Sequence, residues 1–476
     1  MWSLAVSKIG REKQYPNKES IGGKRVIMEK VADMTQGRPL GLLVRFAWLL
    51  LVGSLCQLLY TAADGAVVGQ MLGVNAFAAV GASGFLSWLV TDMILGLTQG
   101  FGILFGQLFG RKQWPMLRQA ITAAMVIGLG AGAVMTVLGL AATGAVLRLM
   151  NTPDLILPLA VSYLQVLFCG VLVTMFNRLA FTLLLSLGNS RTPVTGNIIS
   201  CVLNIVLDIL LVGDLGWGVQ GAAAATVLSQ FICLIYCLTR LRDIPELRPL
   251  DLRLSPAFMG KLLRLGGPLA FRNGVISLGG LFVQSAVNGY GTLFVAGMAA
   301  VEKYFGLLNL PGDALEGAFA NFSAQNYGAR RMDRLKEGIR CSVLLSLISW
   351  GIIAAGVAVW GRELLGLLVS GSPADLEQLL SVGYEYLMIL VLSIPLMYLL
   401  CLYRSGLEGM GNVLAPTFSG FMELGLRILA VLVLPGVMGR WGIYLANPLG
   451  WLGAMILLAV SYHRVYRQKS GNKREE

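Results

Sequence analysis

The sequence predicts an all-α polytopic membrane protein with 12 transmembrane helices in two six-helix bundles, related by a pseudo-two-fold axis along the membrane normal. Three observations support this fold class. Only 13% of the residues are charged and 56% are hydrophobic, whereas about 25% of a soluble domain is charged. Apolar windows of about 20 residues, the length of a membrane-spanning helix, follow one another along the chain. The two halves of the sequence also repeat each other.

The predicted segments are helices because lipid offers no hydrogen-bond partner to an open backbone. The first half contains six apolar windows, at about 42–72, 74–100, 118–142, 156–180, 193–214 and 217–239. The second half contains six more, at about 266–290, 293–323, 339–360, 379–402, 413–435 and 442–463. Each window is long enough to cross the hydrocarbon core.

Polar segments divide the chain into regions. The first polar segment, 1–33, contains no apolar stretch and is therefore not expected to be a signal peptide. We expect a disordered or artefactual cytoplasmic extension at 1–33, an N-terminal lobe at 34–240, a cytoplasmic linker at 241–264, a C-terminal lobe at 265–465 and a basic cytoplasmic tail at 466–476.

The net charge is +12, and the basic residues are distributed as expected for a membrane protein. Of the 37 Lys and Arg residues, 30 belong to one alternating set of loops and tails, and only three belong to the opposite set. This asymmetry is typical of cytoplasmic loops, so both termini are predicted to be cytoplasmic. The basic residues therefore indicate no nucleic-acid partner.

Residue counts exclude several kinds of chemistry. His463 is the only histidine, none of the seven cysteines forms a CxxC pair, and no P-loop motif occurs. A histidine-based triad, a zinc centre and ATP hydrolysis are therefore not expected. We predict no enzymatic activity, no catalytic residue, no metal site and no cofactor.

An internal repeat is the most informative feature of the sequence. Shifts of 218 and 223 residues superpose Gly73 on Gly291, Gln107 on Gln325, Gly110 on Gly328, Tyr163 on Tyr386, Gly188 on Gly411 and Pro193 on Pro416. Because six spans are an even number, both halves enter the membrane in the same orientation, as in transporters built from parallel repeats.

A series of motifs resembles one family of transporters. They are LYTAADGAVVGQMLG around Asp64, the turns QLFGR and QNYGAR, LGNSRTP, LNIVLD at 203–208, GAAAATVLSQ at 221–230 and LEGMGNVLAP. In this order and spacing they resemble the MATE (multidrug and toxic compound extrusion) transporters over about residues 35–465.

Ionisable residues inside the membrane are functional candidates because their burial is costly. Asp64 and Asp208 are predicted in the outer half of the membrane, Asn204 shares a helix face with Asp208, and Thr226 lies at a comparable depth. Together they would form an all-oxygen site for a hard monovalent cation or for proton exchange. The alternative is that Asn204 and Asp208 only hydrogen-bond to neighbouring helices. The resemblance implies the same four positions as a cation site.

The second half has no copy of this acid pair. The residues aligned with Asp64, Asn204 and Asp208 are aromatic, basic or aliphatic, namely Phe282, Arg427 and Val431. We therefore expect one half to carry the coupling ion.

Other intramembrane side chains are candidates for the substrate cleft or for packing. The cleft candidates are Gln57, Tyr60, Asn177, Phe282 and Glu302. Glu423 and Arg427 stand at positions i and i+4, which favours an ion pair within one helix. Arg178 and Arg272 are expected to extend toward the inner membrane boundary.

These features predict a cation-coupled antiporter, driven by Na⁺ or H⁺, that exports amphipathic and mainly cationic organic compounds by alternating access. We expect a monomer in the cell inner membrane, with small organic cations and the lipid bilayer as its partners. One alternative is a lipid-linked saccharide flippase of the same superfamily, although only four basic side chains lie within the apolar windows. A membrane-embedded enzyme is the least favoured alternative.

Overall fold

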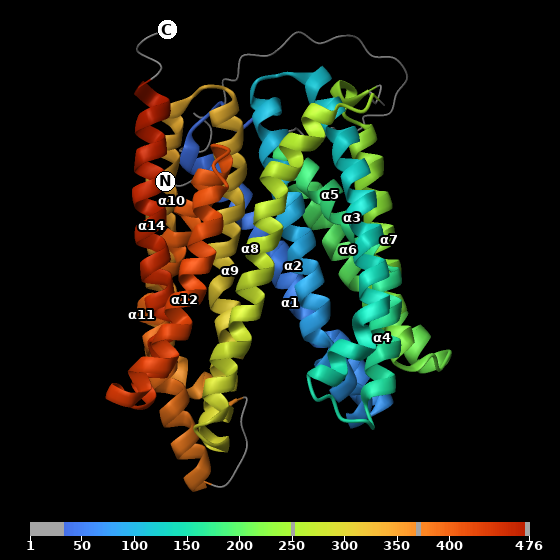
Figure 1. Cartoon of the computed structure of the whole chain (residues 1–476), viewed down its shortest axis with the longest axis vertical. Coiled ribbons are helices and arrows are strands. Elements are labelled where there is room, and N and C mark those ends of the chain that lie inside the picture. The colour runs from blue at the N-terminus through green and yellow to red at the C-terminus, as the bar shows by residue number, and fades with distance from the viewer. Residues whose placement is uncertain (1–32, 249–252, 368–372, 472–476) are drawn as a thin grey trace, which may run out of the picture. The chain divides into compact units, whose positions relative to one another are not determined.

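The structure, a computed structural model, describes residues 33–248, 253–367 and 373–471, in which every regular element is helical (Figure 1). The first half contains α1 (Pro39–Leu72), α2 (Val74–Gly110), α3 (Trp114–Leu149), α4 (Leu157–Cys169), α5 (Val171–Ser186), α6 (Arg191–Asp208), the π-helix η1 (Ile209–Asp214) and α7 (Gly218–Arg242). The short helix η2 (Pro245–Leu247) precedes the second half, which contains α8 (Pro256–Asn288), α9 (Thr292–Gly328), α10 (Met332–Gly366), α11 (Pro373–Gly409), α12 (Leu414–Met438), α13 (Arg440–Tyr444) and α14 (Ala446–Gly471).

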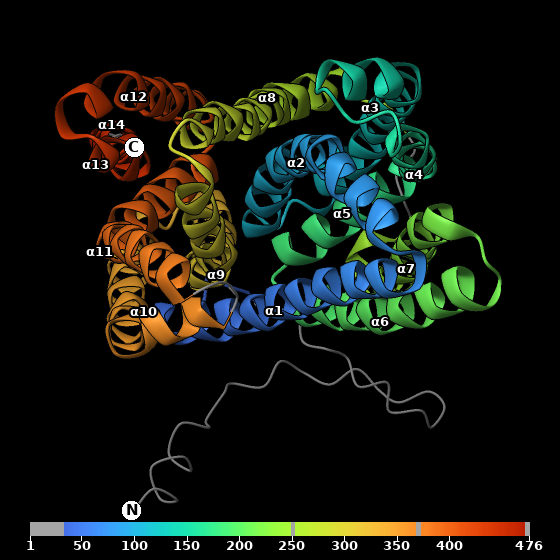
Figure 2. The ribbon, with the colours of Figure 1, turned by 90° about the horizontal axis from the view of Figure 1, so that it is seen from below.

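The predicted fold class is confirmed. Within the described ranges, nine helices are long and apolar enough to cross a membrane, and the bent pair of α4 and α5 brings the number to ten. The two other predicted spans, at about 266–290 and 442–463, fall mainly in α8 and α14, helices of 33 and 26 residues. Figure 2 shows α2 to α7 gathered in one group and α9 to α14 in another, with α1 and α8 each running along one side from one group to the other. The predicted extension before residue 33 lies outside the described residues, and the region boundaries stay predictions.

The fourth span is bent, which the apolar window did not reveal. α4 and α5 meet at Gly170 with an angle of 49° between them. A Cβ atom on Gly170 would lie 2.3 Å from a methyl carbon of Val227 in α7. Glycine therefore permits both the bend and the close approach of α7.

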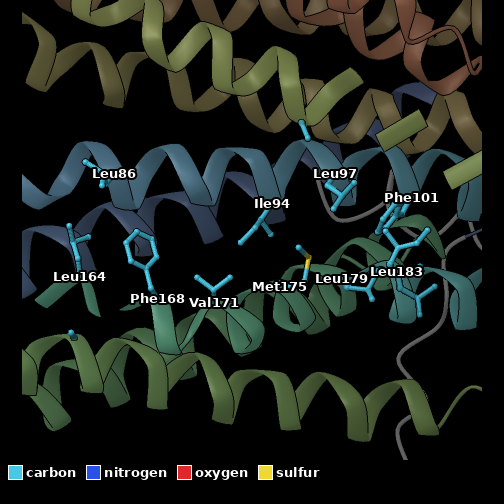
Figure 3. Packing of buried hydrophobic residues seen from close by; sticks show 14 of the residues in the cluster. Leu86, Ile94, Leu97, Phe101, Leu164, Phe168, Val171, Met175, Leu179 and Leu183 are labelled. Carbon is cyan, nitrogen blue, oxygen red and sulfur yellow. The ribbon is translucent and has the colours of Figure 1, made fainter. Parts of the chain in front are cut away.

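The core of the first half holds α4 and α5 against α2. Ile94 and Phe101 of α2 are fully buried, and so is Met175 of α5 (Figure 3). They belong to one cluster of buried apolar side chains together with Phe168 and Leu183. This packing positions α2, α4 and α5, which line one cavity together with α1, α6 and α7.

The two halves contact each other through repeat-related residues. Gln107 Nε2 donates to the carbonyl oxygen of Gly409 at 2.9 Å, and Gln325 Nε2 donates to that of Ser186 at 2.8 Å. The shifts of 218 and 223 residues convert the first hydrogen bond into the second. The internal repeat is therefore expressed as a pair of equivalent hydrogen bonds across the interface between the halves.

Candidate functional site

Two carboxyl groups from different helices meet in the first half. Asp64 lies in α1 and is half-buried, whereas Asp208 is the last residue of α6 and has no exposed surface. Their carboxyl groups are within hydrogen-bonding range of each other. Within the described ranges, the Oδ1 atom of each has no hydrogen-bond donor. Among the described residues, neither aspartate forms an ion pair with a basic side chain.

Asn204 and Thr226 support this pair. In the amide orientation that satisfies both of its polar groups, Asn204 donates to Asp208 Oδ2 at 2.9 Å and accepts from the backbone N–H of Thr226 at 3.2 Å. The Thr226 hydroxyl donates to the carbonyl oxygen of Ala222 at 3.2 Å. Tyr60 OH lies 3.2 Å from Thr226 Oγ1 and consequently acts as the donor there. The four predicted cation-site residues thus lie together, joined by Tyr60.

The local sequence explains how these helices come so close. Asn204 and Asp208 are four residues apart and share one face of α6. Small residues of α7 pack toward them, since Ala222, Ala223 and Ala225 are fully buried. The π-helix η1 begins directly after Asp208. Such π-helical turns are frequent at functional sites because they interrupt the regular α-helical hydrogen bonds.

A cavity of about 440 Å³ opens beside the acid pair. Asp64 and Thr226 line it, and so do the predicted cleft residues Gln57, Tyr60 and Asn177. Asp208 and Asn204 stand behind this wall. Asp64 is therefore a member of the carboxyl pair and also lines a cavity that is large enough for an organic molecule.

This set of ligands fits a proton or a hard monovalent cation. Two carboxylates at hydrogen-bonding range repel each other in a low dielectric unless a positive charge lies between them. A proton would convert the contact into a hydrogen bond, whereas a metal cation would use carboxylate, amide and hydroxyl oxygens. The residues therefore form a candidate site for reversible cation binding.

Two further cleft candidates remain, Phe282 and Glu302. Phe282 is outside the residues whose side chains the structure describes. Glu302, in α9, is exposed, and its Oε1 accepts a hydrogen bond from Tyr386 OH at 3.2 Å. Among the described residues Glu302 forms no ion pair.

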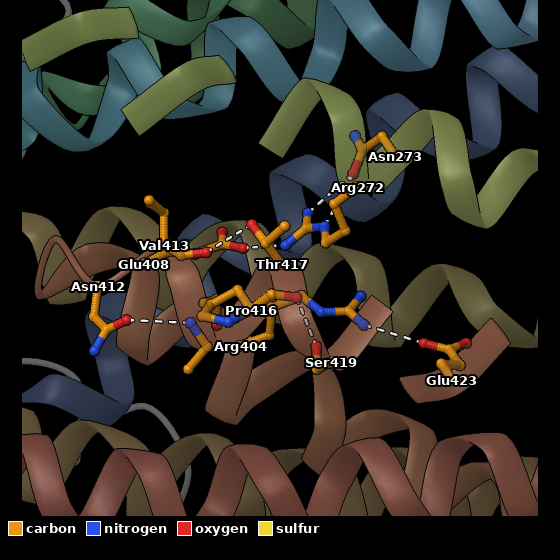
Figure 4. Close-up of polar contacts among 12 residues, drawn as sticks. Arg272, Asn273, Arg404, Glu408, Asn412, Val413, Pro416, Thr417, Ser419 and Glu423 are labelled. Atoms are coloured by element: carbon orange, nitrogen blue, oxygen red, sulfur yellow. Dashed lines mark hydrogen bonds and ion pairs between the residues drawn. The ribbon is translucent and has the colours of Figure 1, made fainter. Parts of the chain in front are cut away.

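The second half contains buried ion pairs that the sequence revealed only in part. The predicted pair of Glu423 and Arg427 is present at 2.5 Å, and Arg404 of α11 also contacts Glu423, at 3.2 Å (Figure 4). The prediction that Arg272 extends to the membrane boundary is wrong, because this side chain is only 4% exposed and pairs with Glu408. Arg404 is likewise buried, near the end of α11.

Replacing Glu423 by alanine is expected to destabilise the second half, because Arg404 and Arg427 would lose their shared carboxylate. Removing one member of a buried ion network costs about 3–5 kcal/mol. Thermal denaturation of the detergent-purified protein measures the effect. The control is Glu377→Ala, which breaks an exposed ion pair with Arg362. The Glu377 side chain is 69% exposed and the Arg362 side chain is 51% exposed. Equal thermal shifts in both variants would contradict a structural role for the buried pairs.

Comparison with known proteins agrees with the motifs. A family model described as MatE matches residues 50–210 and 268–433. The "Probable multidrug resistance protein YoeA" of Bacillus subtilis is 29% identical over 416 residues, which cover 84% of this chain and 89% of that protein. The "Probable multidrug resistance protein YpnP" of the same organism is 30% identical over 360 residues, covering 75% and 80%.

The fold is also found among solved structures. A transporter of the MOP superfamily from Pyrococcus furiosus matches with a TM-score of 0.85 and 20% identity, over 93% of this chain and 100% of that one. The likeness shows that both chains share one fold. The family model and the relatives confirm the resemblance carried by the motifs. The chain belongs to the MatE family and is a multi-pass membrane transporter.

Proposed function

We propose that the protein is a cation-coupled antiporter that exports amphipathic, mainly cationic organic compounds. The observation that carries the proposal is the position of Asp64, which belongs to the carboxyl pair, has an Oδ1 atom with no donor among the described residues, and also lines the cavity. The names of the two Bacillus relatives, which describe multidrug resistance proteins, support export of several compounds.

Competition for one carboxylate provides the coupling. A Na⁺ ion or a proton held between Asp64 and Asp208 neutralises the group that a cationic compound in the cavity would contact. Binding of the ion therefore weakens binding of the compound, and the reverse holds by thermodynamic linkage. Alternating access converts this competition into exchange across the membrane.

The ion site also connects three helices of one bundle. Asp64 lies in α1, Asp208 in α6 and Thr226 in α7. A bound cation attracts all three, whereas the empty pair repels α1 from α6. Ion binding is thus expected to change how these helices pack, which is the bistable element that alternating access requires.

The proposed topology places both termini in the cytoplasm of a monomer in the cell inner membrane, because the basic loops favour that side.

A membrane potential of 100 mV supplies about 2.3 kcal/mol for each charge that crosses. This free energy corresponds to roughly fiftyfold accumulation of a substrate when one net charge crosses per cycle, whereas a one-for-one exchange of monovalent cations is driven by the concentration gradient of the ion alone. The proposed function therefore needs no chemical reaction within the protein.

Transport by reconstituted vesicles tests the proposal. Vesicles preloaded with ethidium, a planar organic cation, receive an imposed Na⁺ gradient or an imposed pH gradient. We expect one of the two to accelerate ethidium release several-fold over vesicles whose gradients are collapsed by ionophores. The effective gradient identifies the coupling ion. Release that is indifferent to both gradients would remove cation coupling.

A further inference from the structure

The cavity beside Asp64 is also lined by an arginine, Arg178. Arg178 lies in the middle of α5, and its side chain faces the same cavity as Asp64. Among the described residues it forms neither a hydrogen bond nor an ion pair. The sequence placed this side chain at the inner membrane boundary, whereas the structure places it in the cavity wall.

The nearest acid does not satisfy this arginine. Asp92 of α2 attracts Arg178 electrostatically. Its carboxylate accepts a hydrogen bond from Ser277 Oγ of α8 at 2.7 Å, and its backbone oxygen accepts from Asn273 at 3.1 Å. These contacts hold Asp92 toward α8. Arg178 is therefore left with five donors and a charge that a membrane interior disfavours.

Asp64 and Arg178 are the only charged side chains that line the cavity among the described residues. The remaining wall is uncharged. Its polar part includes Asn177, whose Oδ1 atom has no donor, and its aromatic part includes Trp88 and Phe181. One cavity thus offers a carboxylate, a guanidinium group and flat aromatic surfaces.

We propose that Arg178 binds a carboxylate of the transported compound, so that the cavity favours planar zwitterionic molecules whose cationic group faces Asp64. A guanidinium group and a carboxylate form a bidentate, charge-assisted contact. This inference rests on the proposed function, because the compound must use this cavity. It adds an anion-recognising residue to a site otherwise defined by acids.

Two dyes with the same chromophore test the inference. Rhodamine B carries a cationic xanthene and a carboxylate, and its ethyl ester keeps the cation but lacks the anionic group. Arg178→Gln is expected to lower ion-driven export of rhodamine B by about tenfold, the effect of losing one charge-assisted contact. Export of the ester is expected to change less than twofold. Arg178→Lys keeps the charge and is expected to retain most of the rhodamine B export.

Three results would overturn the inference: equal loss of both dyes in Arg178→Gln, unchanged export of both, or failure of Arg178→Lys to differ from Arg178→Gln. If Arg178→Gln does not accumulate as folded protein, the wild-type protein decides. Fluorescence anisotropy should then show tighter binding of rhodamine B than of its ester by about tenfold, and equal affinities would contradict the assignment. Preferential binding without ion-driven export would contradict the proposed function alone.

Discussion

Asp64→Asn and Asp208→Asn are each expected to abolish ion-driven ethidium export while the protein still inserts into the membrane. An asparagine keeps the size of the side chain and its capacity to hydrogen-bond, but it removes the charge that attracts a cation. It also removes the exchangeable proton. We expect export to fall by at least about 100-fold, since one lost contact between charges in a low dielectric is worth several kcal/mol.

The matched control for these variants is Asp214→Asn. Asp214 ends η1, six residues after Asp208, and its side chain is exposed. The Asp214→Asn variant should export ethidium at the wild-type rate. Size-exclusion chromatography of the detergent-solubilised protein checks that all three variants fold. Full export by both Asp64→Asn and Asp208→Asn would rule out the acid pair as the coupling site.

The sequence identified the members of this site for physical reasons. Acids inside an apolar window are rare enough to stand out, and the spacing of Asn204 and Asp208 places both on one helix face. The structure adds how close Asp64 comes to Asp208 and that Tyr60 joins the group through Thr226. Those distances depend on the tilt and rotation of each helix, which hydropathy does not encode.

Other features were beyond sequence reasoning because they depend on pairing between distant segments. Arg272 and Glu408 are 136 positions apart, and nothing in either segment names the other as its partner. The close approach of α7 at Gly170 involves Val227, a residue of another helix. Arg178 could have been noticed as a charge inside the window 156–180, but whether it faces lipid, a headgroup or a cavity is decided by packing.

The largest structural effect is expected from alanine at Gly110 or Gly328. These glycines are related by the shift of 218 residues, and each lies against the backbone of the other half. A Cβ atom on Gly110 would lie 2.0 Å from the carbonyl oxygen of Gln325, and one on Gly328 would lie 2.2 Å from that of Gln107. Backbone atoms cannot move aside as a flexible side chain can, so α2 and α9 must separate.

Separation would break the equivalent hydrogen bonds of Gln107 and Gln325 and penalise the state in which this end of the interface is closed. Alternating access needs that state in every cycle. We therefore expect Gly110→Ala and Gly328→Ala to lower ethidium export by at least about tenfold, because a penalty of only 1.4 kcal/mol changes a population tenfold. Ser186, buried at this contact, reports the change. Ser186→Cys in a cysteine-free background should react faster with an impermeant maleimide when alanine replaces Gly328.

Glycines in open surroundings provide the controls, because the prediction concerns the interface and not glycine itself. Gly81 of α2 and Gly306 of α9 have no heavy atom within 4 Å of an added Cβ. Gly81→Ala and Gly306→Ala should export ethidium normally, since alanine is the better helix former. Wild-type export by Gly328→Ala would mean that the two helices need not approach so closely during transport. Loss in all four variants would point to helix flexibility. Loss of ethidium export only in Gly110→Ala and Gly328→Ala would show that transport requires the close contact of α2 and α9 at these two repeat-related glycines.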